Sequence, residues 1–357
     1  MNFLRKKLTE RVSQNSLRTL KTPEGKIDFC SNDYLGIATN KLIKIASSLS
    51  HGSTGSRLLA GNNLLTQSTE NLIAEFHSSE AALIFNSGYD ANLGLLSCIA
   101  NKEDTIIYDQ LSHASIRDGI RLSRAQSFSF LHNDINDLKK KLTIATGNVF
   151  VITESVFSMD GDKAPLLEIS NLCIQYSANL IVDEAHAVGI LGNIGEGLAQ
   201  HLKIQNYCFA RIVTFGKACG VHGAAVVGSL DLRNYLINFA RSFIYTTALP
   251  ESSIAAINAA YRLLPQLTAE RAHLKILIDK VQMEDVTIKK SDTPIQAKII
   301  SGNIDVKMKA DSLQASGFDV RPILYPTVPK GSERLRIILH SFNTIDQVSN
   351  MLDVLNY

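Results

Sequence analysis

Short apolar runs alternate with helical segments from about residue 66 to residue 183, and this alternation constrains the fold more than any other feature. Strands separated by helices at this spacing need crossover connections, which place parallel strands in one sheet with helices on both faces. The pattern therefore predicts a doubly wound α/β domain. Its expected strands are 81–85, 105–109, 127–131, 149–153 and 179–183, and its expected helices are 66–77, 91–100, 114–123, 134–144 and 165–176.

The two ends of the chain have a different pattern. Leu4, Leu8 and Val12 recur at helical spacing and predict an amphipathic N-terminal helix that docks on an apolar surface. After the apolar runs 211–215 and 223–228, a long helical stretch over 252–280 leads into a small α+β domain. That domain has expected strands near 295–300, 320–324 and 335–340 and expected helices over 305–316 and 345–355. We expect an N-terminal arm (1–40), a large domain (41–245) and a small C-terminal α+β domain (246–357).

Composition excludes several classes of protein. The 36 Lys and Arg residues nearly balance the 34 Asp and Glu residues, so no bulk field attracts nucleic acid or an acidic membrane. The five cysteines are scattered without a Cys-x-x-Cys pair, which argues against disulfides and zinc. No segment reaches the roughly 18 consecutive apolar residues of a membrane helix. We expect a cytoplasmic protein without a metal, nucleic-acid or membrane partner.

Two apolar runs end abruptly in reactive groups. Asp183 and His186 follow the run 179–182, and Lys217 follows the run 211–215. Side chains at the carboxyl ends of buried parallel strands emerge where ligands bind. An isolated strand-end lysine is more often a surface residue, and a lone aspartate is more often a helix cap. Together, a nucleophilic lysine and a carboxylate able to pair with a protonated pyridine nitrogen indicate pyridoxal phosphate.

The segment Asp183-Glu-Ala-His186 also resembles the DEAH box of nucleic-acid ATPases. An ATPase of that kind needs the phosphate loop G-x-x-x-x-G-K-[ST]. Here Gly216-Lys217 is followed by Ala218, and no other segment fits. We therefore exclude the ATPase.

Other turns after expected strands carry polar groups. Residues 86–89 open a helix whose free N–H groups would cradle a phosphate, although such a turn is often a plain connection. His113 stands at the start of another helix, as a stacking or hydrogen-bonding group or beside a simple Ser112 cap. Ser158 is a polar contact candidate in the loop 155–162.

Two segments with arginines are candidates for anion binding. The glycine-rich run 52–57 would hold an anionic substrate with its backbone amides and Arg57. Arg334 and Arg336 point to the same face of a strand because side chains alternate, so one of them would clamp a carboxylate.

Taken in order, these segments resemble the α-oxoamine synthases, a family of fold-type-I pyridoxal-phosphate (PLP) enzymes. Within the family, the segments 111–115 and 214–225 are similar to those of the 8-amino-7-oxononanoate synthases of the biotin pathway. The resemblance covers nearly the whole chain. It is carried by residues 31–36, 111–115, 156–162, 183–186, 214–217, 325–329 and 334–336.

The resemblance implies a role for each matched residue. Lys217 would hold the cofactor covalently and later act as acid and base, with Asp183 on the pyridine nitrogen, His186 on the ring hydroxyl and His113 stacked on the ring. The other implied cofactor residues are Gly88, Tyr89, Ser158 and Thr214, with Thr246 and Thr247 reaching the cofactor phosphate of the neighbouring subunit. The implied substrate residues are Arg18, Asn32, His113, Thr327 and Arg336.

The implied reaction is the decarboxylative condensation of L-alanine with pimeloyl-CoA or the pimeloyl carrier protein, in a homodimer with shared active sites. Its products would be 8-amino-7-oxononanoate, CO2 and the free thiol carrier. Leu324 departs from the arginine that biotin-pathway members often carry, and Arg321 is a nearby candidate to replace that arginine. Two alternatives stay open: a glycine-using synthase of the 2-amino-3-ketobutyrate CoA ligase or 5-aminolevulinate synthase type, and an idle PLP fold that acts as a binding partner.

Overall fold

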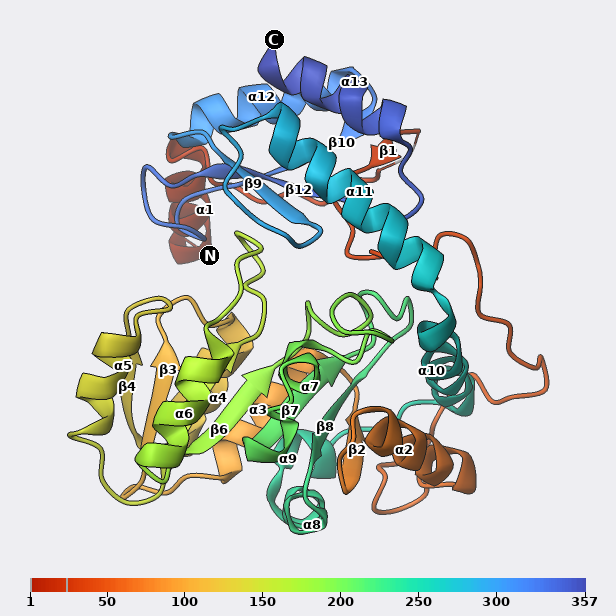
Figure 1. Ribbon diagram of the computed structural model, residues 1–357, viewed down its shortest axis with the longest axis vertical. Coiled ribbons are helices and arrows are strands. Elements are labelled where there is room, and N and C mark those ends of the chain that lie inside the picture. Colours follow the sequence, from red (N-terminus) through yellow and green to blue (C-terminus); the bar gives the residue numbers. More distant parts are fainter. Residues whose placement is uncertain (1, 24) are drawn as a thin grey trace. The chain divides into compact units, whose positions relative to one another are not determined.

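The computed structural model describes residues 2–23 and 25–357, which divide into two compact units (Figure 1). Unit 1 comprises the N-terminal segment up to Tyr34, Ser158–Asp162 and Ala269–Tyr357. Unit 2 comprises Leu35–Phe157 and Lys163–Thr268. This grouping differs from the expected boundary at 245, because residues 246–268 stay with unit 2, where helix α10 (Glu251–Leu263) packs against α2 (Leu64–Phe76).

Unit 2 is built on a seven-stranded sheet with the order β2-β8-β7-β6-β5-β3-β4. All neighbouring strands pair in parallel except β8, which is antiparallel to both β2 and β7. This mostly parallel sheet confirms the predicted α/β fold. The strands are β2 (Ala81–Phe85), β3 (Thr105–Asp109), β4 (Gln126–Phe130), β5 (Val149–Glu154), β6 (Asn179–Asp183), β7 (Cys208–Thr214) and β8 (Ala224–Gly228).

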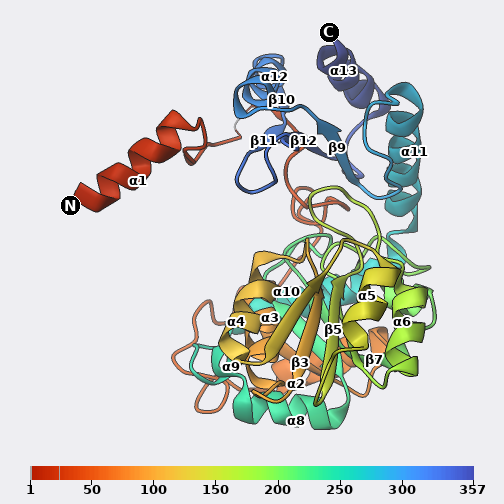
Figure 2. The same cartoon turned by 90° about the vertical axis from the view of Figure 1, so that its left-hand side faces the viewer.

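Helices cover both faces of this sheet. One face packs against α3, α4, α8 and α9, and the opposite face carries α5 and α6 (Figure 2). The crossover helices form where the sequence predicts them, and the short helices α7 to α9 were not predicted. The helices are α3 (Gly88–Cys98), α4 (Ala114–Ser123), α5 (Ile135–Leu142), α6 (Leu166–Gln175), α7 (Leu198–His201), α8 (Leu230–Phe239) and α9 (Arg241–Ile244).

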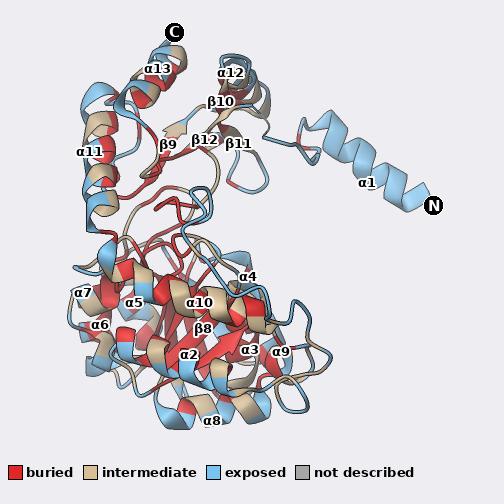
Figure 3. Ribbon diagram, turned by 90° about the vertical axis from the view of Figure 1, so that its right-hand side faces the viewer, coloured by how far each residue is buried: buried red, intermediate tan, exposed pale blue. Residues whose placement is uncertain are grey.

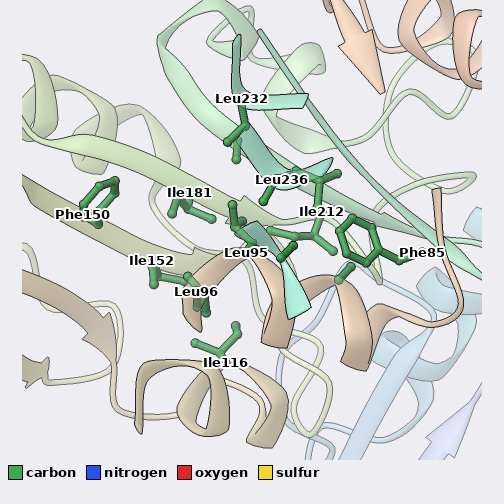
Figure 4. Packing of buried hydrophobic residues seen from close by; sticks show 14 of the residues in the cluster. Phe85, Leu95, Leu96, Ile116, Phe150, Ile152, Ile181, Ile212, Leu232 and Leu236 are labelled. Carbon is green, nitrogen blue, oxygen red and sulfur yellow. The ribbon is translucent and has the colours of Figure 1, made fainter. Parts of the chain in front are cut away.

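A cluster of buried apolar side chains joins the sheet to α3, α4 and α8 (Figure 4). Leu95 and Leu96 of α3 lie against Ile152, Ile181 and Ile212 of the central strands, and all five are fully buried. Truncating one such leucine to alanine costs about 2–5 kcal/mol of unfolding free energy. This packing fixes α3 over the strands whose ends carry the candidate site.

Unit 1 holds two small sheets. Strands β11 (Arg321–Ile323), β12 (Arg334–Ile338) and β9 (Ile295–Ile299) are antiparallel, and β1 (Ile27–Asp28) pairs in parallel with β10 (Phe318–Asp319). The accompanying helices are α11 (Thr268–Glu284), α12 (Asn303–Ala315) and α13 (Ile345–Asn356).

Two sequence-based expectations about helices need correction. The single helix expected over 252–280 is α10 and α11, separated by a 3-10 turn that contains Pro265, which has no N–H to continue a helix. Helix α1 (Asn2–Ser13) forms as predicted, but Leu4, Leu8 and Val12 are 55%, 57% and 55% exposed, so its apolar face has no docking surface within the described chain (Figure 3). In residues 2–23 and 25–357, no helix has the length and apolar character needed to cross a bilayer.

Candidate functional site

The candidate site of unit 2 lies at the carboxyl edge of the central strands. Glu154 ends β5, Asp183 ends β6 and Thr214 ends β7, while His113 precedes the first turn of α4. Neighbouring strands β5, β6 and β7 are parallel, so their last residues share one edge of the sheet. Two of these strand-end residues, Asp183 and Thr214, were predicted from the sequence.

Asp183 is a buried carboxylate with two hydrogen-bond donors. Asn92 of α3 donates through Nδ2 to Oδ2 at 2.8 Å, and the backbone N–H of Ala185 donates to Oδ1 at 3.0 Å. A buried anion is stable only when donors replace its lost water. The arrangement therefore favours an ionised Asp183, which is the form that pairs with a protonated ring nitrogen.

Glu154 lies beside Asp183 in the register of the two strands. It is also buried, and its Oε1 accepts a 2.7 Å hydrogen bond from the backbone N–H of His113. Burial and the neighbouring charge of Asp183 raise the pKa of Glu154 to about 8. Glu154 was not among the predicted site residues.

His113 caps helix α4 with its own ring. Its Nδ1 accepts the backbone N–H of Ser115 at 3.2 Å and lies 2.8 Å from Ser115 Oγ, so the alternative of a Ser112 cap is wrong. Asn92 donates to the same hydroxyl at 3.1 Å. Burial lowers the pKa of His113, the charge of Asp183 opposes this shift and the charge of Lys217 adds to it. A neutral His113 whose Nδ1 is an acceptor carries its proton on Nε2.

Lys217 belongs to the loop of an antiparallel hairpin between β7 and β8. The loop is closed by backbone hydrogen bonds from Gly220 to Lys217 at 2.8 Å and from Val221 to Phe215 at 2.9 Å. Lys217 is half-buried, and its charge affects the pKa of both His113 and Glu154. His186 is buried in the turn after β6.

The N-terminus of α3 lies next to Thr214 and is a candidate phosphate cradle. Ser87 caps the helix by accepting the backbone N–H of Asp90 at 3.1 Å, and the helix begins at Gly88. A Cβ at Gly88 would lie 2.6 Å from Cγ2 of Thr214, so only glycine permits this approach. Free N–H groups at the start of a helix suit a phosphate. The residues present thus fit a cofactor with a phosphate and a protonated ring nitrogen.

Three further predicted cofactor residues take separate positions. The Tyr89 hydroxyl donates to Asp118 of α4, so its side chain joins two helices. Asn86 stands between β2 and α3, two residues before Gly88. It donates to Thr246 Oγ1 at 3.1 Å and to the carbonyl of Thr247 at 2.9 Å, so both threonines are held near the start of α3.

Of the predicted substrate residues, all but His113 lie in unit 1. Arg336 donates through Nη2 to Asn32 Oδ1 at 2.9 Å and through Nε to the carbonyl of Ser158 at 2.6 Å. Ser158, predicted as a cofactor ligand, therefore lies with the substrate residues of this unit. Arg18 donates to Thr327 Oγ1 at 3.0 Å.

Three other arginines already have carboxylate partners. Arg57 binds Glu70 through two hydrogen bonds of 2.9 and 3.2 Å, so the structure does not support its expected role in binding an anionic substrate. Arg321 forms an ion pair with Asp319 at 2.5 Å, which speaks against its use as the substitute for an arginine at position 324. Arg334 forms a buried ion pair with Asp160.

Sequence reasoning missed Asn92, Ser115 and Glu154. Glu154 could have been found by the signal that identified Asp183, a carboxylate at the end of an apolar strand. The strand was expected to end at Thr153 and runs one residue further. Asn92 is a single amide among apolar neighbours of α3, and no motif distinguishes it.

Comparisons with known proteins identify the family of this chain. Residues 24–353 match the family model for aminotransferase class I and II. The 8-amino-7-oxononanoate synthase of Emericella nidulans is 38% identical over 387 residues, which cover 99% of this chain and 94% of that protein.

Solved structures extend the comparison to the fold. The serine palmitoyltransferase of S. paucimobilis, solved with bound PLP and myriocin, has a TM-score of 0.88 and 26% identity over 99% of this chain and 96% of that chain. The 8-amino-7-oxononanoate synthase of Francisella tularensis has a TM-score of 0.79 and 31% identity over 93% of this chain and 97% of that chain. The chain therefore belongs to the aminotransferase class I and II family, and within it to the 8-amino-7-oxononanoate synthase group of α-oxoamine synthases.

Proposed function

We propose that this protein condenses L-alanine with a pimeloyl thioester, releasing 8-amino-7-oxononanoate, CO2 and the free thiol carrier for biotin biosynthesis. The family assignment supports this reaction, with PLP as the cofactor. The observation that carries it is the grouping of Lys217, His113 and a doubly hydrogen-bonded Asp183 at one edge of the sheet. These are the groups that a PLP enzyme needs around its ring.

When bound, PLP supplies an aldehyde carbon that amines attack and a ring that withdraws electrons. Lys217 would hold it through Nζ and then remove the α-proton of alanine and return one. Asp183 would keep a proton on the ring nitrogen, since its two donors hold it ionised in a buried position. His186 would hydrogen-bond the ring hydroxyl, and His113 would stack on the ring.

The remaining residues would bind and orient. Gly88, Tyr89, Thr214 and Ser158 would hold the cofactor, mainly around its phosphate. Arg336, oriented by Asn32, would clamp the carboxylate of alanine through a charge-assisted hydrogen bond. Such a clamp sets which bond of the α-carbon faces the ring.

In unit 1, Arg18 and Thr327 would contact the acyl substrate, and their mutual hydrogen bond supports a joint role.

A homodimer with shared sites is part of the proposal. Thr246 and Thr247 would reach the cofactor phosphate of the neighbouring subunit. Two large apolar side chains are exposed: Tyr245, which precedes these threonines in the chain, is 72% exposed, and Leu59 is 86% exposed. Leu59 belongs to the segment whose Gly55 carbonyl accepts the N–H of Ala248 at 2.9 Å. We expect both side chains to become buried in the subunit interface.

Mixing two inactive variants tests the shared site. Lys217→Ala copies mixed with Thr246→Val/Thr247→Val copies form hybrid dimers in which one site has both intact parts. We expect recovery of about a quarter of the wild-type activity after random exchange of subunits. No recovery, with hybrids demonstrated by mass measurement, would contradict a shared site.

A substrate panel tests the reaction. Turnover is measured with alanine, glycine and serine, each against pimeloyl-CoA, pimeloyl carrier protein and short acyl-CoA thioesters. We expect alanine with a pimeloyl thioester to give the highest kcat/KM. A clear preference for glycine with a short acyl-CoA would replace this assignment by the glycine-using alternative.

The role of Lys217 has its own test. Borohydride reduction should fix the cofactor on Lys217 in the wild type, and Lys217→Ala should lose both this label and turnover. Lys139→Ala, at an exposed position of α5, is the matched control and should keep both. Full turnover of Lys217→Ala would favour the idle PLP fold instead. The cytoplasmic location stays a prediction from the sequence.

A further inference from the structure

We propose that Glu154 and Asp183 carry one proton between them, held on Glu154, and that Glu154 thereby positions His113 and leaves Asp183 as the single anion of the pair. The proposal rests on the proposed function, because it assigns a positioning residue to the same site. Nothing in the sequence motifs assigned a role to Glu154.

The two carboxyl groups are neighbours on the same face of the sheet. Strands β5 and β6 are parallel, with Glu154 opposite Asp183 and Ile152 opposite Ile181. Both isoleucines belong to the core cluster under α3 and α4. Side chains of alternate residues share a face, so Glu154 and Asp183 also point toward α3 and α4. Their hydrogen bonds to His113 before α4 and to Asn92 of α3 agree with this direction.

The hydrogen bonds decide which carboxyl keeps the proton. Two adjacent buried carboxylates do not both ionise easily, because their charges repel in a poorly solvated site. Asp183 accepts from the Asn92 amide and the Ala185 N–H, whereas within residues 2–23 and 25–357 the carboxyl group of Glu154 accepts from the His113 N–H alone. Donors stabilise the anion, so the anion forms on Asp183 and the proton stays on Glu154.

Burial and the charged groups around Glu154 together raise its pKa, which also favours the proton on Glu154. Burial has the largest effect and raises the pKa of Glu154, and the charges of Asp183 and Asp109 raise it further. The His113 N–H and the charge of Lys217 oppose this shift. The net result is a pKa of about 8, so Glu154 is mostly protonated at neutral pH.

A neutral Glu154 has two consequences for the site. Its Oε1 holds the backbone of His113 while Ser115 holds the ring, so that His113 is fixed at its backbone and at Nδ1 of its ring. Ionisation of Glu154 would add a second anion near Asp183 and Lys217, and with the cofactor bound it would favour protonation of the nitrogen through which Lys217 holds it. We therefore expect the bound cofactor to show a spectral titration step near pH 8 that depends on Glu154.

The protonation state is read directly by infrared spectroscopy of the full chain without cofactor. The wild type at pH 7 should show the carbonyl band of buried carboxylic acids. Burial also raises the pKa of Glu184, so the contribution of Glu154 is the part of the band that Glu154→Gln removes. In Asp183→Asn, the midpoint at which the band disappears should fall by at least about one pH unit, because the repelling charge is gone. A wild type without the band, a band of unchanged intensity in Glu154→Gln, or an unchanged midpoint of the Glu154 contribution in Asp183→Asn would overturn the proposal.

The positioning role is read from PLP binding by the same variants. Glu154→Gln keeps the acceptor for His113 and should bind PLP within about threefold of the wild type at pH 7, whereas Glu154→Ala should bind at least about tenfold more weakly. The holoenzyme of Glu154→Gln should lack the spectral step near pH 8. Equal losses in both variants, or a retained step, would contradict the role. The infrared result does not depend on turnover, so a failed substrate panel would refute the reaction and leave this inference standing.

Discussion

Nδ2 of Asn92 lies 2.8 Å from Oδ2 of Asp183, so helix α3 supplies a donor to the carboxylate that ends strand β6. Asn92 stands four residues after Gly88, which opens the same helix, and residues four apart share a face of a helix. One helix thus serves both the phosphate cradle and the buried carboxylate. A substitution of Asn92 should therefore weaken cofactor binding although Asn92 is not one of the cofactor residues predicted from the sequence.

Replacing Asn92 with leucine tests this relationship. The variant keeps the side-chain volume but leaves Asp183 with only the Ala185 N–H, and the lost bond to a charged group is worth about 1.5–3 kcal/mol. We expect PLP affinity to fall about tenfold or more in absorbance titrations. Ser97→Ala, which removes only a bond to the Gly94 carbonyl on the same helix, should bind PLP normally. Equal affinities of the two variants would contradict this role of Asn92.

The cradle at Gly88 gives a second prediction. In Gly88→Ala the new methyl group would lie 2.6 Å from Thr214 Cγ2, so Thr214 has to move away from the helix N-terminus. We expect PLP affinity to fall by at least about tenfold while far-ultraviolet circular dichroism stays unchanged. Gly52→Ala is the control, since nothing lies within 4 Å of its added Cβ. Normal PLP binding by Gly88→Ala would show that the contact is not needed.

Arg334 and Arg336 should differ in what they support. Arg334 forms a buried ion pair with Asp160, and removing one partner of such a pair costs about 3–5 kcal/mol, so Asp160→Asn should lower the urea midpoint of the protein. Arg336 contacts Asn32 and a carbonyl, so Arg336→Gln should mainly raise KM for alanine. A lowered urea midpoint in Arg336→Gln, with a raised KM for alanine in Asp160→Asn, would contradict these separate roles of the two arginines.

The same aspartate predicts how stability depends on acid. Burial alone would raise the pKa of Asp160, but the Lys289 hydrogen bond and the charge of Arg334 outweigh it and lower the pKa. A folded-state pKa below the unfolded value stabilises the protein above the unfolded value of 3.8, and this stability is lost as pH falls through the folded value. We expect acid unfolding of the wild type to be steeper below pH 4 than that of Asp160→Asn. Parallel acid-unfolding curves would contradict the shift.

For Glu154 we expect stability to depend on pH in the opposite direction. Its pKa is raised from 4.5 to about 8 in the folded protein, so the folded state holds a proton that the unfolded chain releases. The cofactor-free wild type should therefore lose stability between about pH 5 and 8, by an amount on the order of a few kcal/mol. Glu154→Gln should lose much less over this range in urea titrations at each pH. A wild type whose stability is flat over this range would contradict the raised pKa.

The sequence predicted the sheet and the residues at its strand ends because both follow from apolar periodicity. Asp183 and Lys217 were found since each ends an apolar run. Side-chain partners were harder to predict: Arg57 and Glu70 stand 13 residues apart, and only the packing of α2 brings them together. The hairpin that carries Lys217 was also hidden, because the run 223–228 does not reveal that its strand is antiparallel.

Fragments of this chain face a constraint that arises from Ser158–Asp162. These five residues belong to unit 1, although unit 2 supplies the chain on both sides of them. A fragment that ends near residue 245 or 268 would keep Asp160 and lose both Arg334 and Lys289, its two cationic partners. Deleting the segment would instead leave Arg334 as a buried charge without its carboxylate. Neither unit can therefore be expressed alone without losing part of this ion-pair network. An exchange of unit 1 between related synthases must transfer Ser158–Asp162 together with Ala269–Tyr357.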